Sequence, residues 1–489
     1  MGVLAKMRER FPIIKVLVDA QKTVWYPVFF AILCVIAGVN DYTVYIPIMW
    51  VLVAFTLFSL LFTDDNKVFL TPLCIIFTAI GSDAPSYSFY ESEGELLSFM
   101  HADALGHIIA MGIIAVGSFI VRLFVDGSIA AAFRKRRGFT YGIIAMDVAF
   151  LLNGVFSPTY QLWNFTFGAL LAAVLTAVYF LVSGMLEKSE DPIKYGCMAM
   201  LCAAYAAFAE ILIVVLRLQA EGKYIMGVGE SAVINKNMLA LGWGVSTVVS
   251  AVFVLGIPVA MYLAKSCRAS FIFYFSCPVF IFGTILVNTR GSMLVSIVTF
   301  IVCAAVGCVK GRNKKLIRIY TAICSCLAVA GGIFVVVNDP DVLSAIAKIL
   351  RFDISSDTGR SELWQNGFDD FKRSPLLGSG FADGAFDLGS ENNNVYSNMY
   401  HCIIIQWLGA AGIVGCIAFL IHLIDCARLL FKRISSGKLV LMLVPLMIIA
   451  MSLLDNFFFY PHFQIFYAIF LALAEYSHDK SNVISKGAD

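Results

Sequence analysis

The chain contains few charged residues. Of its 489 residues only 14% are Asp, Glu, Lys or Arg, whereas 60% are hydrophobic, and the net charge is +2. Soluble domains carry about 25% charged residues. The composition therefore excludes an ordinary soluble domain and indicates a protein that crosses a membrane several times.

Several motifs that carry chemistry are also missing. The sequence has no Walker loop, no dinucleotide fingerprint, no zinc-ligand spacing and no acidic cluster beside a soluble domain that would hold a nucleotide-sugar and its metal. The 13 cysteines form no CxxC pair, and we interpret them as buried free thiols. We therefore predict no metal, no cofactor and no nucleic-acid partner. An enzyme of this kind is expected to use a lipid-linked donor at an extracytoplasmic site, where no nucleotide is available.

Apolar runs long enough to cross a bilayer occupy most of the sequence. They cover residues 24–39, 43–62, 68–81, 104–124, 139–156, 164–184, 195–216, 238–263, 269–287, 293–309, 319–338, 401–423, 439–454 and 463–476. We predict an all-α, polytopic integral membrane protein with about 12–14 transmembrane helices and one large extracytoplasmic loop, residues 339–400.

The basic residues predict the orientation of these spans. Fourteen crossings return both termini to one side, and the basic segment 1–22 makes that side the cytoplasm. Most of the 35 lysines and arginines then lie in cytoplasmic segments, and the outer loop 82–101 has none. No small-residue cleavage site follows segment 1–22, so we expect an uncleaved signal-anchor helix.

The remaining basic residues fall on the predicted outer face, against the general bias. They are Arg217, Lys223, Lys236, Arg290, Lys348, Arg351, Arg360, Lys372 and Arg373. Surface charge on a long loop explains some of them. Arg217 and Arg290, however, lie at span boundaries in short polar breaks, which favours binding of an anion there. The alternative for each arginine is a side chain that extends to the membrane interface.

The loop 339–400 has its own helical patterns. Segment 342–352 has apolar residues at helical spacing and is expected to lie on the membrane surface. A second helix is predicted after Thr358, with Leu363, Trp364, Phe368 and Phe371 on its apolar face. Pro375 and the glycines Gly378 and Gly380 then predict a tight turn.

His401 opens the twelfth span, at its predicted outer mouth. If the helix is continuous, Gly412 lies on the same face, because eleven residues correspond to a rotation of only about 20°. Gly409, Gly412 and Gly415 then form a strip of small residues that lets another helix approach closely. A histidine at this place suits proton transfer as a general base. The alternative is an interfacial histidine that caps a membrane helix.

Other polar residues lie at or within the spans. Arg290, with Leu294 one turn later on the same face, offers a fork of donors for phosphate or pyrophosphate. Asn235 and Asn237 are candidates either for binding sugar hydroxyls or for capping a helix. Glu210 shares a helix face with Arg217, and its structural and functional interpretations are equally open. Asp147 is expected to face the bundle interior.

Four features of the sequence resemble the O-antigen ligase and polymerase superfamily of bacterial membrane glycan transferases. The first is Arg290 followed by Leu294, and the second is the loop sequence "TGRSELWQNGFDDFKRSPLLGSGF" with Arg360, Trp364 and the Gly378–Gly380 turn. The third is His401, separated by ten residues from Gly412-x-x-Gly415, and the fourth is Arg217 followed by Asn235 and Asn237. Cys402 departs from the family pattern, which has a small polar residue after the histidine.

The resemblance implies a catalytic region at residues 210–460, between N-terminal transmembrane helices (1–209) and a last helix with its tail (461–489). It implies a bacterial cytoplasmic membrane protein with an extracytoplasmic active site. The donor would be a glycan on undecaprenyl pyrophosphate and the acceptor a glycan or glycolipid, with membrane lipid and other polysaccharide-assembly proteins as further partners. Arg217, Arg290 and Arg360 would hold the pyrophosphate, and His401 would deprotonate the acceptor hydroxyl.

Three functions follow from these observations. We expect a polymerase of surface polysaccharide repeat units, because polymerases form the broader group within the superfamily. The first alternative is an O-antigen ligase that passes the chain to lipid A core or another terminal acceptor. The second alternative is a flippase or transporter of lipid-linked oligosaccharides, although the two halves of the sequence show no similarity to each other.

Overall fold

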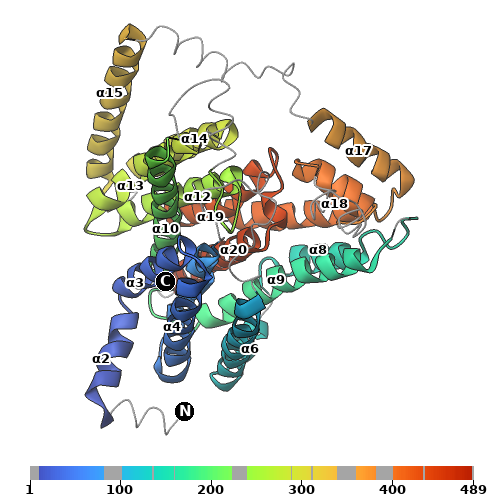
Figure 1. Ribbon diagram of the computed structural model, residues 1–489, viewed down its shortest axis with the longest axis horizontal. Helices are drawn as coiled ribbons and strands as arrows, with labels where there is room; N and C mark the ends of the chain where they lie inside the picture. The colour runs from blue at the N-terminus through green and yellow to red at the C-terminus, as the bar shows by residue number, and fades with distance from the viewer. Residues whose placement is uncertain are drawn as a thin grey trace. The chain divides into compact units, whose positions relative to one another are not determined.

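The computed structural model describes residues 10–81, 102–134, 137–158, 160–222, 239–287, 289–309, 312–338, 360–381, 400–432 and 435–486. Nearly all of them lie in helices (Figure 1). Among these residues, β-type pairing is confined to an isolated bridge between Leu241 and Gly244. The prediction of an all-α membrane protein is confirmed.

The chain divides into two compact units, and each unit combines two separate stretches of sequence. Unit 1 comprises Met1–Ala131 and Gly184–Ile349, and unit 2 comprises Ala132–Ser183 and Leu350–Asp489. The predicted catalytic region 210–460 therefore contributes to both units.

Unit 1 is built around one deeply buried helix, α12 (Ser246–Ser266), which packs against α10, α13 and α14. The helices of this unit are α2 (Pro12–Gln21), α3 (Trp25–Gly38), α4 (Tyr42–Phe62), α5 (Leu70–Ile75), α6 (Ala102–Val125), α10 (Pro192–Ala220), α12, α13 (Ser270–Leu286), α14 (Arg290–Val309) and α15 (Lys314–Asn338). Small residues permit the close packing: a Cβ on Gly256 would come within 2.7 Å of the Phe280 ring of α13.

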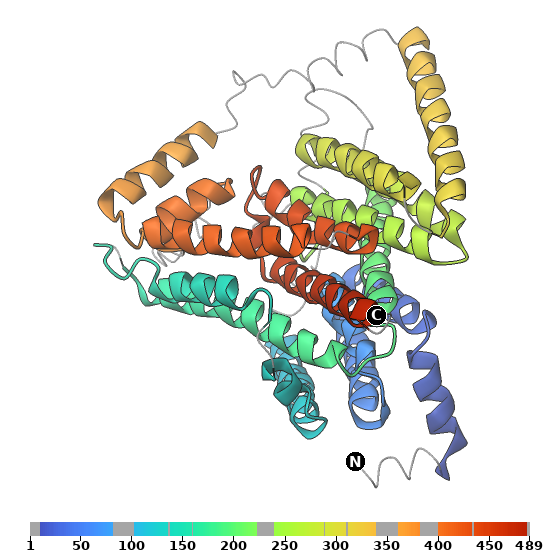
Figure 2. The same ribbon diagram turned by 180° about the vertical axis from the view of Figure 1, so that it is seen from behind.

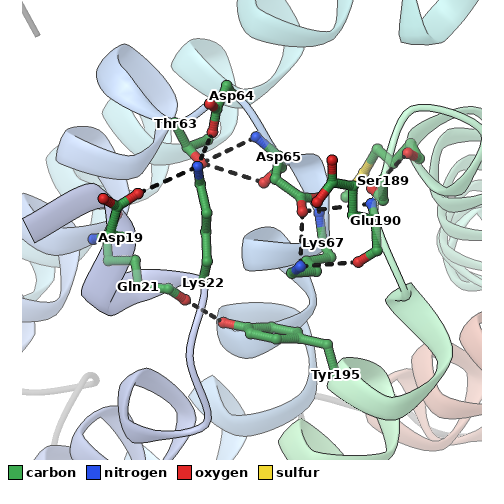
Figure 3. Close-up of polar contacts among 11 residues, drawn as sticks. Asp19, Gln21, Lys22, Thr63, Asp64, Asp65, Lys67, Ser189, Glu190 and Tyr195 are labelled. Carbon is green, nitrogen blue, oxygen red and sulfur yellow. Dashed lines mark hydrogen bonds and ion pairs between the residues drawn. The ribbon is translucent and has the colours of Figure 1, made fainter. Parts of the chain in front are cut away.

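A cluster of ion pairs and hydrogen bonds joins three segments of unit 1 (Figure 3). Lys22 pairs with Asp64 and Asp19, and Lys67 pairs with Asp65 at 2.8 Å. The Lys67 Nζ also donates to the backbone carbonyl of Glu190 at 2.9 Å. All three segments were predicted to lie on the cytoplasmic side, and their contact is expected of segments on one side of a membrane.

Unit 2 contains α8 (Thr140–Leu152), most of α9 (Leu162–Leu186), α17 (Arg360–Arg373), α18 (Ile403–Phe431), α19 (Ser436–Met451) and α20 (Pro461–Lys486), and the short helix α7 (Ser128–Phe133) spans the boundary between the units. Helix α18 packs along α8, α19 packs on α20, and α17 packs on the first half of α18 (Figures 1 and 2). An aromatic core, with the buried Trp407 ring in contact with Phe150, Phe381 and Phe459, fills the unit.

The helices agree with the apolar runs, but fewer of them are complete spans. Seven helices of the described residues are long and apolar enough to cross a membrane, or eight if the bent pair α2 and α3 is one span. Four further apolar helices have only 10–17 residues, and about 20 are needed to cross the hydrocarbon core. The predicted run 68–81, for example, forms three short helices between Asn66 and Ala79.

Candidate active site

His401 forms a hydrogen bond with an acidic residue that the sequence analysis did not single out. Its Nδ1 lies 2.8 Å from Oδ1 of Asp455, and the His401 side chain is 39% exposed. Asp455 lies in the short connection after α19 and is buried. It is the only acidic residue between Asp425 and Glu475, but no local pattern relates it to a histidine 54 positions earlier.

The surroundings of Asp455 keep it ionised. Burial raises the pKa of this carboxyl, but the hydrogen bond from His401 and the charge of His401 lower it. The backbone N–H of Asn456, 2.7 Å from Oδ1, and the positive charge of Arg360 lower it further. The net effect is a pKa below the ordinary value of an aspartate, so the carboxylate is negative at neutral pH.

Arg360 is the first residue of α17 and is exposed. Its positive charge lowers the pKa of Asp455, and further along the same helix Gly367 lies against Ile405 of α18. The structure thus brings together two residues that the sequence analysis selected separately. Trp364, one turn further along α17, is 40% exposed and remains accessible.

The backbone of His401 is held in an unusual conformation. Its φ angle is +50°, in the left-handed region that residues other than glycine rarely adopt. Such a conformation costs about 1–3 kcal/mol and persists only where the surroundings enforce it. Helix α18 begins two residues later, at Ile403, whose backbone N–H donates to the carbonyl of Ser452 at 2.6 Å.

Helix α18 is broken at Gly412, which has φ +63° and ψ −155°. The expectation that His401 and Gly412 share one helix face is therefore wrong, because it requires a continuous helix that includes both residues. Gly412 is needed for its backbone conformation, which a residue with a side chain adopts only with strain.

The turn after Pro375 fills the break in α18. The N–H groups of Ile413 and Val414 donate to the carbonyls of Pro375 and Leu376 at 2.9 and 3.1 Å. In return, the N–H groups of Ser379 and Gly380 donate to the carbonyls of Gly409 and Ala410, both at 2.9 Å. The predicted turn is confirmed, and it supplies the partners that the broken helix lacks.

The glycines of the turn and the break are explained by this contact. Gly378 and Gly380 have φ angles of +67° and +110°. A Cβ on Gly378 would lie 2.3 Å from the backbone of Ala410, and one on Gly412 would lie 2.5 Å from the carbonyl oxygen of Leu376. The element that approaches Gly412 is thus a turn, not another helix as expected. Gly415 faces Trp407 and Ala411 of its own helix.

Two asparagines that the sequence analysis did not single out hold the other side of the turn. Asn153, after α8, accepts a hydrogen bond from the N–H of Phe381 at 3.0 Å. Asn164, in the first turn of α9, donates to the carbonyl of Ser379 at 3.4 Å. Both side chains are buried. The turn is therefore fixed by three elements of unit 2.

Helix α17 contacts α18 through a glycine. A Cβ on Gly367 would lie 2.4 Å from Ile405 and 3.1 Å from the Tyr400 ring. On the face predicted to be apolar, Trp364 and Phe368 are 40% and 41% exposed. The close contact thus depends on Gly367, which the sequence analysis did not predict. Thr358 and segment 342–352 lie outside the described residues.

The other predicted site residues belong to unit 1. Arg290 begins α14, where it is exposed, and Leu294 is exposed one turn later. Ser292 of the same turn is hydrogen-bonded to Ser250 of α12 at 2.7 Å, which fixes the start of α14. Arg217, near the end of α10, donates to the carbonyl of Val39 at 3.0 Å. Asn235 and Asn237 lie outside the described residues.

Glu210 and Asp147, the acidic residues that the sequence analysis considered within the spans, have polar partners. Glu210 is buried and accepts a hydrogen bond from Trp243 Nε1 at 2.8 Å. Asp147 accepts one from the hydroxyl of Thr176 on α9. These contacts favour the structural interpretation of Glu210 and give Asp147 the partner that the sequence did not identify.

In a comparison with known protein families, one family matches the part of the chain that contains most of these residues. Residues 275–420 match the model of the family described as O-antigen ligase. The match includes Arg290, Arg360, His401, Gly412 and Gly415, and it ends before Asp455. No curated protein matches the chain. Residues 275–420 are thus similar to the O-antigen ligase family, and this match supports a relation of the chain to the O-antigen ligase and polymerase superfamily of glycan-transferring membrane enzymes.

Proposed function

We propose that the protein transfers a glycan from undecaprenyl pyrophosphate to an acceptor sugar hydroxyl on the extracytoplasmic face of a bacterial cytoplasmic membrane, and that it thereby polymerises surface polysaccharide repeat units. The observation that carries this proposal is the His401–Asp455 pair beside Arg360. The family match supports glycan transfer in general, and the details of donor, acceptor and membrane side are our inference.

The hydrogen bond to Asp455 makes His401 suitable as a general base. An ionised carboxylate accepts hydrogen bonds and cannot donate them, so His401 Nδ1 must carry the hydrogen in the 2.8 Å contact with Asp455. In neutral His401 the other ring nitrogen, Nε2, then has no proton and can accept one. Asp455 also stabilises the imidazolium that forms when Nε2 takes a proton, a role that carboxylates have in other histidine-dependent enzymes.

The transfer follows from this protonation state. Nε2 of His401 takes the proton of the acceptor hydroxyl while its oxygen forms a bond to the anomeric carbon of the donor sugar. The bond from that carbon to the pyrophosphate oxygen breaks, and undecaprenyl pyrophosphate leaves as an anion. The proton on His401 then passes to water. A displacement of this kind inverts the anomeric configuration.

Arginines balance the charge of the leaving group. The positive charge of Arg360 lowers the pKa of Asp455, and the Arg360 side chain is exposed at the start of α17. Its guanidinium can bind pyrophosphate oxygens through two parallel hydrogen bonds. We assign the same role to Arg290 and Arg217, and we retain Asn235 and Asn237 as candidates for binding sugar hydroxyls. Stabilisation by fixed cations lowers the barrier to departure of an anion.

An O-antigen ligase is the second candidate, because the matching family is described by that activity. A polymerase and a ligase would use the same base and the same donor chemistry. They differ in the acceptor, which is either a lipid-linked repeat unit or a separate glycolipid.

The test is transfer by the purified full-length protein in nanodiscs, with a synthetic undecaprenyl-pyrophosphate glycan and no added nucleotide or divalent metal. Wild type, Arg290→Ala and His401→Ala are compared by gel and mass spectrometry, with His107→Ala as the histidine control. A ladder of longer lipid-linked chains that is formed by wild type and lost in Arg290→Ala and His401→Ala supports a polymerase. Consumption of donor only after a lipid A core acceptor is added supports a ligase. Lipid movement across the membrane without any transfer would contradict both and favour a flippase.

A further inference from the structure

Tyr400 connects the candidate base to the loop helix α17. It immediately precedes His401, is only 2% exposed, and its hydroxyl donates to Oδ2 of Asp370 at 2.6 Å. Its ring is enclosed by two glycines: a Cβ on Gly367 of α17 or Gly409 of α18 would come within 3.1 or 2.7 Å of the ring. The phenol therefore lies between the two helices, and its hydroxyl is fixed by a carboxylate of α17.

The backbone on both sides of His401 is fixed as well. Before it, the N–H of Tyr400 donates to Oε1 of Gln406 at 3.0 Å. After it, the N–H of Ile403 donates to the carbonyl of Ser452 at 2.6 Å. His401 itself precedes the helix and has the left-handed φ of +50°. Its orientation is therefore set by these neighbours and not by a regular helix.

We propose that Tyr400 and Asp370 are positioning residues for His401, and that through them helix α17 aligns the imidazole with Asp455. This inference rests on the proposed function. Arg360, a candidate for donor binding, and Asp370 belong to the same helix. One element would therefore carry a group that binds the donor and also align the base that activates the acceptor.

The alternative is that the Tyr400–Asp370 hydrogen bond only adds stability to the packing of α17. Steady-state kinetics of transfer separate the two. We expect kcat to fall about tenfold or more in Tyr400→Phe and in Asp370→Ala, with an unchanged KM for the donor. The double variant should be no slower than either single variant, because both remove the same bond. Asp370→Asn keeps an acceptor oxygen and should restore most of the rate.

Asp369→Ala is the matched control. Asp369 is the neighbouring carboxylate on α17 and pairs with Lys372 at 2.8 Å on the exposed side of the helix. Its loss removes a charge and an ion pair from the same helix but no contact to Tyr400. We expect its kcat and KM to equal those of wild type.

A second measurement does not depend on transfer. The rate at which diethyl pyrocarbonate modifies His401 is followed by peptide mass spectrometry in the purified full-length protein. We expect this rate to change several-fold in Tyr400→Phe and Asp370→Ala, and to be unchanged in Asp369→Ala. Thermal unfolding of each variant shows what fraction is folded at the assay temperature.

The outcomes separate the two proposals. If His401→Ala is inactive while Tyr400→Phe and Asp370→Ala keep the wild-type kcat and His401 reactivity, the positioning role is refuted and the proposed function stands. A loss of rate that only follows the folded fraction also refutes it. If His401→Ala is fully active, the proposed function is refuted, and unchanged His401 reactivity in Tyr400→Phe would then refute the positioning as well.

Discussion

Replacing Asp455 with Asn removes the negative charge beside His401 but keeps an acceptor for the hydrogen bond that His401 donates. Oδ1 of Asp455 accepts hydrogen bonds from His401 Nδ1, at 2.8 Å, and from the backbone N–H of Asn456, at 2.7 Å. In Asp455→Asn the amide oxygen should occupy this place, because the N–H of Asn456 requires an acceptor there. His401 then keeps its acceptor and its tautomer, and only the negative charge is lost.

The magnitude follows from the difference between a charged and a neutral acceptor. A hydrogen bond to a charged group contributes about 1.5–3 kcal/mol, against about 0.5–1.5 kcal/mol for a neutral one. The loss of about 1–2 kcal/mol lowers kcat by about 5- to 30-fold. Asp455→Ala also leaves Nδ1–H and the N–H of Asn456 without an acceptor, which costs about 1–3 kcal/mol more. The expected order of kcat is wild type, then Asp455→Asn, then Asp455→Ala.

The assay is the rate of glycan transfer at saturating donor, at pH 7, with Asp369→Asn as a control for loss of a carboxylate. The KM for the donor should change little, because Asp455 acts through His401. Equal rates for Asp455→Asn and wild type would refute the stabilisation of an imidazolium by Asp455. If kcat falls as far in Asp455→Asn as in Asp455→Ala, the claim that His401 keeps its tautomer in Asp455→Asn is refuted.

Three further predictions follow from the same geometry. Gly412→Ala should lower the free energy of unfolding by at least about 1–3 kcal/mol, the cost of a side chain in a backbone conformation that is essentially confined to glycine, whereas Gly117→Ala, whose Cβ meets nothing within 4 Å, should not lower the melting temperature. Arg360→Ala should raise the KM for the donor or lower kcat at least tenfold, with Lys372→Ala close to wild type; equal kinetics for both variants would contradict a role of Arg360 in donor binding. Because the pKa of Asp455 lies below its ordinary value, its ionised form stabilises the fold above about pH 4, and this stability is lost as the pH falls through the lowered pKa. The difference in melting temperature between wild type and Asp455→Asn should therefore shrink below about pH 4, and a constant difference would contradict it.

The features that could be predicted from the sequence are those that local patterns determine. Apolar runs predict the helices, and a polar insert with periodic aromatic residues predicts α17. His401 was selected because a titratable residue at a membrane boundary needs a reason to be there, and Arg360 because the loop sequence around it resembles that of the family. Pro375 and the paired glycines predicted the turn, which the φ angles of Gly378 and Gly380 confirm.

The features that could not be predicted depend on contacts between distant segments. Asp455 is an isolated acidic residue at the end of an apolar run, and only the folded chain brings it to His401. Gly412 has the spacing of a helix-packing glycine, and a helical period gives no sign that the helix is broken at that residue. The Tyr400–Asp370 hydrogen bond joins α17 to the residue before His401 across 30 positions.

The central claim is that His401 is the base of a glycan transfer. The most direct measurement is the single-turnover rate at which His401→Ala transfers the glycan from undecaprenyl pyrophosphate to its acceptor, with His107→Ala and wild type measured alongside. General-base catalysis contributes about 10²–10⁴-fold, so we predict a loss of at least 100-fold in His401→Ala and none in His107→Ala. A His401→Ala protein that is folded and transfers the glycan within a few-fold of the wild-type rate would contradict the claim.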